Sequence, residues 1–187
     1  ITKNETVYLN SLGVGSISAA EVNNGSFDNC GINTETIDIS NFTCINVGAN
    51  TVTLTITDIN GNINTATSIV TVTDTISPIV ATQPDTIYLD ATGNDTLTVS
   101  QVEISSSDNC GINSKSLDRT SFDCTHTSHD QTVVLTVSDI NGNNKSINAL
   151  VTVLDTIKPT VLTKNIDVYL DAFGDAIITP VFINNGS

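Results

Sequence analysis

The protein has 187 residues, of which 20 are Asp or Glu and only 6 are Lys or Arg, so its formal net charge is −14. An acidic chain of this kind repels phosphate backbones and anionic lipid surfaces, which argues against nucleic acid as a partner. No apolar run approaches the roughly 18 residues that a membrane helix needs, so membrane insertion of this segment is not expected. A hydrophobic content of 39% favours a folded chain over a disordered one.

The chain repeats itself with an offset of 80 or 81 residues. The matching segments are TVYLN 6–10, TIYLD 86–90 and DVYLD 167–171; DNCGIN 28–33 and 108–113; DINGN 58–62 and 139–143; and DTISP 74–78 and DTIKP 155–159. A period this long, with whole strand patterns inside it, predicts tandem domains. We expect a first repeat at residues 1–74 that lacks its N-terminal edge, a second repeat at 75–155, and a partial third repeat at 156–187 that holds only the first strands.

The partial third repeat cannot bury a two-sheet core alone. We therefore expect it to be frayed, paired with a neighbour, or completed by residues outside this chain. The chain contains no Met and no basic segment followed by an apolar one, so we expect an excerpt of a longer protein whose secretion signal and anchor lie elsewhere.

The four cysteines form two pairs with equal spacing, Cys30 with Cys44 and Cys110 with Cys124, each 14 positions apart. Equal spacing favours one disulfide per repeat and an oxidising, extracellular setting. Each bond would close a loop of roughly 15 residues and add about 3 kcal/mol of stability. Buried free thiols are the alternative. A zinc site is disfavoured because no His accompanies the first pair, and two thiolates do not complete a tetrahedral shell.

Within each repeat, apolar residues alternate with polar ones. NTVTLTIT at 50–57 places one set of side chains inward and its threonines outward, as a half-buried antiparallel strand does. The expected inward residues are Val52, Leu54 and Ile56, and in the second repeat Val133, Leu135 and Val137. INGN supplies the Asn-Gly turn of a hairpin, whose return strand runs through Val70 and Val72 or Val151 and Val153. Short strands with turns between them predict an all-β fold of tandem Ig-like antiparallel β-sandwiches.

The order of the motifs S-x-DNCG, F-x-C, V-x-L-T-[IV]-x-D-I-N-G-N and V-T-V-x-D-T-I-x-P resembles the HYR-type Ig-like repeat and related bacterial Ig-like modules. Large surface adhesins, including gliding-motility adhesins of Bacteroidota, carry arrays of such modules. The resemblance implies an extracellular stalk or adhesive filament on the cell surface, stiffened by calcium at domain junctions. The sequence departs from many HYR modules because no Cys follows DINGN, so the disulfide pairing above is inferred from spacing alone.

A calcium site follows from the topology of an Ig-like sandwich. The loop between strands B and C and the loop between F and G lie where the chain enters the domain, beside the last strand of the preceding domain. If DNCG and DINGN are these loops, Asp74 approaches five residues of the second repeat: Asp108, Asn109, Asp139, Asn141 and Asn143. Neighbouring carboxylates repel one another unless a cation sits among them, and Asp and Asn oxygens suit Ca²⁺. The alternative is that these residues serve only as turn formers.

The same reasoning predicts incomplete sites at both ends. Half of a site is expected from Asp28, Asp58, Asn60 and Asn62, with an Asp before residue 1 as the other half. The expected partners of Asp155 are loops of the unfinished third repeat or, alternatively, Asp90 and Asp95. Bound calcium and the short linkers with Pro78 and Pro159 would turn a string of domains into a semi-rigid rod.

Features outside the duplicated framework are few. His126 and His129 lie in THTSHD at 125–130, and we expect them to be solvated rather than to bind a metal. Nothing else offers a nucleophile or an acid/base pair, so we expect no enzyme. There is no Trp, and Tyr8, Tyr88 and Tyr169 recur at one framework position, where we expect packing rather than a sugar-binding platform.

Asp-Thr-aliphatic triplets resemble the O-glycosylation sequon of Bacteroidota. The candidate sugar sites are Thr75, Thr86, Thr96 and Thr156. Two functions are left open by the sequence: a structural stalk whose partners are neighbouring repeats, and a segment that itself binds a glycan or protein through variable loops such as residues 125–131.

Overall fold

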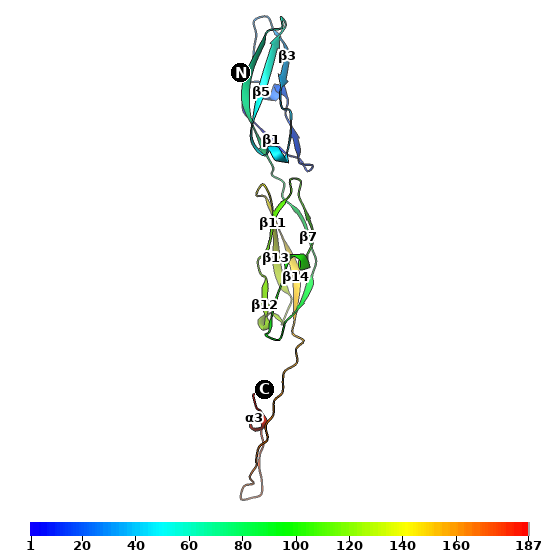
Figure 1. The fold of residues 1–187 in the computed structure, drawn as a ribbon, viewed down its shortest axis with the longest axis vertical. Coiled ribbons are helices and arrows are strands. Elements are labelled where there is room, and N and C mark those ends of the chain that lie inside the picture. Colours follow the sequence, from blue (N-terminus) through cyan, green and yellow to red (C-terminus); the bar gives the residue numbers. More distant parts are fainter. Residues whose placement is uncertain (187) are drawn as a thin grey trace.

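The computed structural model describes residues 1–186 and contains two β-sandwiches that follow one another along the chain. Figure 1 shows them stacked end to end as a rod, with the C-terminal residues extending beyond the second. The predicted fold class, tandem Ig-like antiparallel β-sandwiches, is confirmed by the strands described below. Among the described residues, no helix has the length and apolar character required to cross a membrane.

The first repeat is built around a four-stranded sheet in the order β1-β6-β5-β3. Its strand β1 runs parallel to β6, and the other neighbours are antiparallel, while β2 pairs with β4 in a second, two-stranded sheet. The elements are β1 (Glu5–Tyr8), β2 (Val14–Ser16), α1 (Ala19–Val22), β3 (Ile32–Ile37), β4 (Asn41–Thr43), the 3₁₀ turn η1 (Cys44–Asn46), β5 (Gly48–Asp58) and β6 (Ile63–Thr73).

The second repeat has the same plan. Its four-stranded sheet has the order β11-β13-β14-β8, with β8 parallel to β14, and two-stranded pairs β10-β7 and β12-β9 complete it. The elements are β7 (Ile79–Thr82), β8 (Asp85–Tyr88), β9 (Asn94–Thr96), α2 (Val99–Val102), β10 (Glu103–Ser107), β11 (Ile112–Leu117), β12 (Ser121–Asp123), η2 (Cys124–His126), β13 (Gln131–Asp139) and β14 (Asn144–Leu154).

The alternation in β5 and β13 fills the cores as predicted. Val133, Leu135 and Val137 are fully buried, as are Val52 and Leu54, whereas Ile56 is half-buried at the margin of its core. Phe42 and Phe122 are the largest fully buried side chains. At about 25 cal/mol per Å² of apolar surface, such residues supply most of the stability of each small core.

The prediction that the recurring tyrosines pack in the framework is wrong. Tyr8 is 64% exposed, Tyr88 57% and Tyr169 87%. Their neighbours in the strand, such as Val7 and Leu9, point into the core instead. Since successive side chains of a strand face opposite sides, a tyrosine between two inward residues must face solvent.

The C-terminal residues keep local features of a repeat without its core. Helix α3 (Pro180–Ile183) and the bridge between Thr163 and Asn184 match α1 and the bridge between Thr2 and Asn23. From Asp155 to residue 186 every side chain is exposed except the half-buried Ile166. No strand is present in residues 155–186, so this part of the described chain does not form a sandwich of its own.

Candidate metal centre at the domain junction

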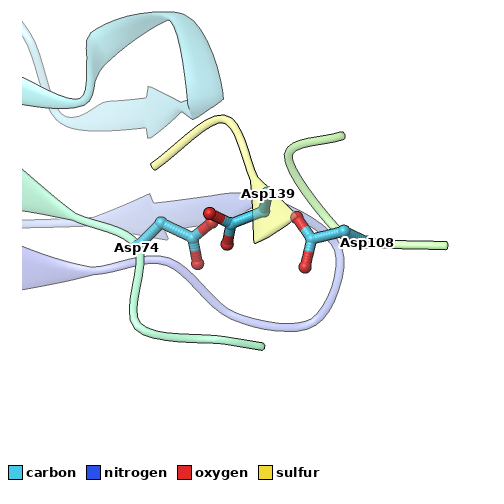
Figure 2. Close-up of side chains that lie close together, drawn as sticks. All are labelled: Asp74, Asp108 and Asp139. Carbon is cyan, nitrogen blue, oxygen red and sulfur yellow. The ribbon is translucent and has the colours of Figure 1, made fainter. Parts of the chain in front are cut away.

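Three acidic side chains from three separate segments meet between the two repeats. Asp74 follows β6, Asp108 begins the loop between β10 and β11, and Asp139 ends β13. Oxygen atoms of the three carboxylates all lie within 4.8 Å of one another, and Figure 2 shows the carboxylates side by side. Asp74 is 5% exposed and Asp139 1%, while Asp108 is half-buried. The structure therefore brings together the three carboxylates that the topology predicted.

The DINGN turn holds Asp139 in place. Its Oδ1 accepts the backbone N–H groups of Asn141 at 2.9 Å and Asn143 at 2.8 Å, which closes the turn around the carboxylate. Its Oδ2 accepts the side-chain amide of Asn143 at 2.8 Å, and the same amide donates to the backbone oxygen of Asp74 at 3.2 Å. Asn143 thus joins the turn of the second repeat to the linker that leaves the first.

The DNCG loop positions Asp108 in a similar way. Oδ1 of Asp108 accepts the backbone N–H groups of Cys110 at 2.9 Å and Gly111 at 3.2 Å. Asn109, the next residue, donates its side-chain amide to Oδ1 of Asp74 at 3.1 Å and to the backbone oxygen of Asn10 at 3.3 Å. Asp74 and Asp108 each use Oδ1 for backbone N–H groups of their own segment and leave Oδ2 without a partner, so turn formation does not occupy the whole carboxylate.

Four side-chain oxygens of the residues at the junction have no hydrogen-bond donor. Oδ2 of Asp74 and of Asp108, and Oδ1 of Asn109 and Asn141, are buried atoms without a partner. Buried oxygens normally find a partner, and a buried carboxylate without one is costly. Within residues 1–186, the ion pairs join Lys3 to Glu5, Lys115 to Glu103 and Asp123 to His126, and none of them reaches this cluster. The three carboxylates form a donor set that fits a hard divalent cation, and the unpartnered amide oxygens of Asn109 and Asn141 belong to the same two loops.

A disulfide lies at the same junction, and it corrects the predicted pairing. Cys44 of the first repeat is bonded to Cys110 of the second, with a Cα–Cα distance of 5.3 Å, whereas Cys30 and Cys124 are free and exposed. The expected bonds Cys30–Cys44 and Cys110–Cys124 within each repeat are therefore wrong.

Strand direction explains this outcome. Strand β5 begins at Gly48, opposite Val72 near the exit from the first repeat, and ends at Asp58, opposite Ile32 beside the DNCG loop. Cys44 lies just before β5 and Cys30 just before β3, so the two cysteines lie at opposite ends of the sandwich. A strand of 11 residues spans about 35 Å, far beyond the reach of a disulfide.

A tight turn completes the contact between the repeats. Gly13 has φ +72°, and a Cβ atom there would lie 2.7 Å from Sγ of Cys44 and 2.8 Å from the backbone oxygen of Asn109. The turn at residues 10–14 is closed by a bond from the N–H of Gly13 to the oxygen of Asn10. The sequence reasoning missed this turn, although a glycine repeated at positions 13, 93 and 174, just after each YL[ND] segment, was a usable signal.

The first repeat carries the same two loops at its own entrance. Asp58 accepts the N–H groups of Asn60 and Asn62, both at 2.8 Å, and the side-chain amide of Asn62 at 2.7 Å. This amide is the main reason that the pKa of Asp58 lies below its usual value. Asp28 accepts the N–H of Cys30 at 2.8 Å. Across residues 1–186, the cluster at the junction is the one group of three such ligands, so the half-site expected at these loops stays a prediction.

Asp155 occupies in the second repeat the place of Asp74 in the first. Its Oδ1 accepts the N–H of Ile157 at 2.9 Å, as Oδ1 of Asp74 accepts that of Ile76 at 3.1 Å. The exposed Asp155 belongs to no group of three ligands in the described chain, so the alternative that Asp90 and Asp95 would meet it is not realised. Asp90 instead accepts N–H groups of its own turn, at Thr92 and Asn94.

The remaining candidate residues lie away from the junction. All four threonines of the sequon-like triplets, Thr75, Thr86, Thr96 and Thr156, are exposed. Nδ1 of His126 lies 2.8 Å from Oδ1 of Asp123, and its ring contacts Phe122 edge-on, while Nδ1 of His129 lies 2.8 Å from Oγ of Ser128. The two histidines thus have different local partners.

Comparison with family models finds no match, and comparison with characterised proteins finds none. Solved structures with similar strands include the protocadherin GammaB4 extracellular domain, with 13% identity over 82% of this chain and 31% of that chain, at a TM-score of 0.38. Human mucin-like protocadherin EC1-2 has 12% identity over 83% of this chain and 97% of that chain, at 0.33. The Ig1-2 module of the Drosophila receptor protein tyrosine phosphatase DLAR has 8% identity over 82% and 94%, at 0.27. The chain spans 31% and 48% of the length of the first two protocadherin chains that it matches.

Proposed function

We propose that this chain is a structural stalk segment of an extracellular cell-surface adhesin, in which Ca²⁺ at the domain junction helps to hold consecutive repeats in line. The ion would be bound by Asp74, Asp108 and Asp139, with the amide oxygens of Asn109 and Asn141 completing the shell. Its neighbours in the array are further repeats, and the ligand-binding tip lies elsewhere in the adhesin.

The observation that carries the proposal is the set of buried oxygens without donors at the junction. Oδ2 of Asp74 and Oδ2 of Asp108 belong to different repeats, and the two carboxylates have oxygens within 4.8 Å of each other. A divalent cation there removes the repulsion between the carboxylates and bonds to both repeats at once. Asn143 would then act by holding Asp139 and the linker in position, because its amide nitrogen is already engaged by both.

The disulfide chemistry and the sequence motifs both support an extracellular environment. A disulfide between repeats fits an oxidising, extracellular environment. The motifs DNCG and DINGN resemble those of HYR-type modules in bacterial surface adhesins, including gliding-motility adhesins of Bacteroidota. On that reading, the exposed Thr75, Thr86, Thr96 and Thr156 are candidates for O-linked sugars, and the stacked sandwiches form part of a filament.

The experiment must separate the cation from the disulfide, since either would limit motion between the repeats. We would record small-angle scattering of the Cys44→Ser variant with Ca²⁺ and with a chelator. Chelation is expected to broaden the distribution of interatomic distances in this variant and to change it much less in the disulfide-bonded chain. Identical curves for the variant in both conditions would rule out a stiffening role for calcium.

A second measurement distinguishes a spacer from a ligand-binding segment. The intact chain is tested for binding to cells and to a glycan array. A spacer binds neither, whereas saturable binding that is lost when residues 125–131 are replaced by the shorter loop of the first repeat would favour ligand recognition.

A further inference from the structure

The two free cysteines are the counterparts of the two bonded ones. Cys30 holds in the first repeat the position that Cys110 holds in the second, and Cys124 holds in the second the position of Cys44 in the first. The bonded pair is half-buried between the repeats, while the free pair is exposed at the two outer ends of the rod. The two repeats therefore share one disulfide, and each outer end has one free cysteine at a position that is bonded in the other repeat.

The surroundings of Cys124 reproduce those of Cys44. Each follows a short strand, β12 or β4, and opens a 3₁₀ turn. Sγ of Cys44 lies 3.8 Å from the backbone oxygen of Gly13, and Sγ of Cys124 lies 3.7 Å from that of Gly93. A Cβ atom at Gly13 would come 2.7 Å from the first sulfur, and one at Gly93 2.8 Å from the second. Sγ of Cys124 thus occupies the same place in the second repeat that Sγ of Cys44 occupies in the first.

The turn beside Cys124 is also the same. The N–H of Gly93 donates to the oxygen of Asp90 at 2.9 Å, as that of Gly13 donates to Asn10 at 2.8 Å. In the first repeat, this turn supplies the backbone oxygen that accepts the amide of Asn109. The exit end of the second repeat therefore presents the surface to which a DNCG loop binds at the junction.

The entrance of the first repeat presents the matching part. Asp28 fixes the loop by accepting the N–H groups of Cys30 at 2.8 Å and Gly31 at 3.2 Å, and Asp108 does the same for Cys110 at 2.9 Å and Gly111 at 3.2 Å. The loop therefore has the same shape whether its cysteine is free or bonded. The unbonded loop of the first repeat therefore already has the conformation that the bonded loop has at the junction.

We propose that Cys124 forms a disulfide with the DNCG cysteine of a following repeat of this kind, and Cys30 with the counterpart of Cys44 in a preceding one. Every junction of the array is then closed by the same covalent bond between neighbours, and no repeat has a disulfide of its own. Each bond forms from two thiols, which lose two protons and two electrons to a small disulfide such as oxidised glutathione. That oxidant is reduced to two thiols.

The test lengthens the chain with its own residues. A second copy of residues 75–155 is inserted directly after Asp155, which restores the natural order D-T-I-S-P at the new junction. The copy carries Cys124→Ser, so that Cys124 is unique, and Ser114→Thr at an exposed position, so that its DNCG peptide differs in mass from the original. Cys124 then precedes the DNCG cysteine of the copy by a separation within one residue of the 66 between Cys44 and Cys110. The protein is folded in a glutathione redox buffer, alkylated, digested without reduction and analysed by mass spectrometry.

The expected products are the Cys44–Cys110 bond and a bond from Cys124 to the inserted DNCG cysteine, with Cys30 alkylated. Alkylation of Cys124 should be at least tenfold lower than that of Cys30, in Ca²⁺ and in chelator alike, so the result does not depend on the proposed metal. A Cys124→Ser version is the matched control and leaves the inserted cysteine alkylated. The proposal is overturned if Cys124 and Cys30 are alkylated equally while Cys44–Cys110 is intact.

A second measurement covers the case in which the inserted repeat does not fold. The 187-residue chain is oxidised at high concentration, so that the ends of different molecules meet. Linked peptides should contain Cys30 with Cys124 at least tenfold more often than Cys30 with Cys30 or Cys124 with Cys124. A statistical mixture of the three would show that the ends do not recognise each other.

Discussion

Asp74 and Asp139 belong to different repeats, yet carboxylate oxygens of the two lie within 4.8 Å of each other, and the side chain of Asn143 donates hydrogen bonds to both residues. Such proximity is unfavourable for two charged, buried groups unless something compensates the charge. The junction therefore combines polar contacts that hold the carboxylates together with a charge that a cation would neutralise.

Asp139→Asn should weaken Ca²⁺ binding to the chain by at least tenfold, because a cation site loses affinity with each charged ligand removed. Isothermal titration calorimetry of the variant and the parent measures this directly. The matched control is Asp58→Asn, which removes the same turn-forming carboxylate from the first repeat but leaves the junction intact. Equal losses in the two variants would place calcium binding in the turns themselves.

Gly13→Ala should prevent the repeats from docking. The alanine must adopt φ +72° and place its Cβ 2.7 Å from the sulfur of Cys44 and 2.8 Å from the oxygen of Asn109. Gly25→Ala is the control, since Gly25 has φ +79° but nothing within 4 Å of a Cβ atom. Both variants bear a backbone cost of about 1–2 kcal/mol. Only Gly13→Ala should also leave Cys44 and Cys110 reduced, which a thiol-specific reagent would report.

Cys44→Ser should loosen the junction while leaving the two cores almost unchanged. The bond joins the sandwiches at their ends, where both cysteines are half-buried at the margin of the first core, so each repeat should lose only about 1 kcal/mol of unfolding free energy. Phe42→Ala is the contrasting variant, because its ring is fully buried and its loss should cost the first repeat about 3–5 kcal/mol. Denaturant unfolding of both variants decides whether the disulfide acts on the junction or on a core.

Glu103→Gln should destabilise the second repeat in a pH-dependent way. Lys115, whose ammonium lies 2.6 Å from the Glu103 carboxylate, lowers the pKa of that carboxyl below its usual 4.5. Because the pKa of Glu103 is lower in the folded chain than in the unfolded chain, the ion pair stabilises the fold fully above the unfolded-state pKa. This stabilisation disappears as the pH falls through the folded-state pKa. The variant should be less stable by about 0.5–1 kcal/mol at pH 7 and equal to the parent near pH 2. A constant difference across this range would assign the effect to packing.

Much of the fold could be predicted from the sequence because the pattern is local. The alternation through Val133, Leu135 and Val137 places each of these residues inward, and the Asn-Gly turn joins β13 to β14. The same alternation, applied to TVYLN, puts Tyr8 outward between Val7 and Leu9. Our packing prediction for that tyrosine relied on its recurrence instead, and recurrence does not specify which face of a strand a residue occupies.

The junction was predictable in part. The position of DNCG and DINGN at the entrance of an Ig-like domain was enough to bring Asp108 and Asp139 to Asp74. The disulfide was not found, because equal spacing within each repeat is equally compatible with pairing between repeats. The choice depends on which end of the sandwich each cysteine occupies, and Cys44 precedes a long strand that returns to the entrance end.

The bond between Cys44 and Cys110 also changes how the chain would respond to tension along its length. A force along the chain passes directly from Cys44 to Cys110 and bypasses the 66-residue separation between them. Even if both sandwiches unfolded, this bond would prevent the chain between the two cysteines from extending to its full length of roughly 220 Å. Under load, the two-repeat unit can therefore lengthen only through the residues that lie outside the bonded loop.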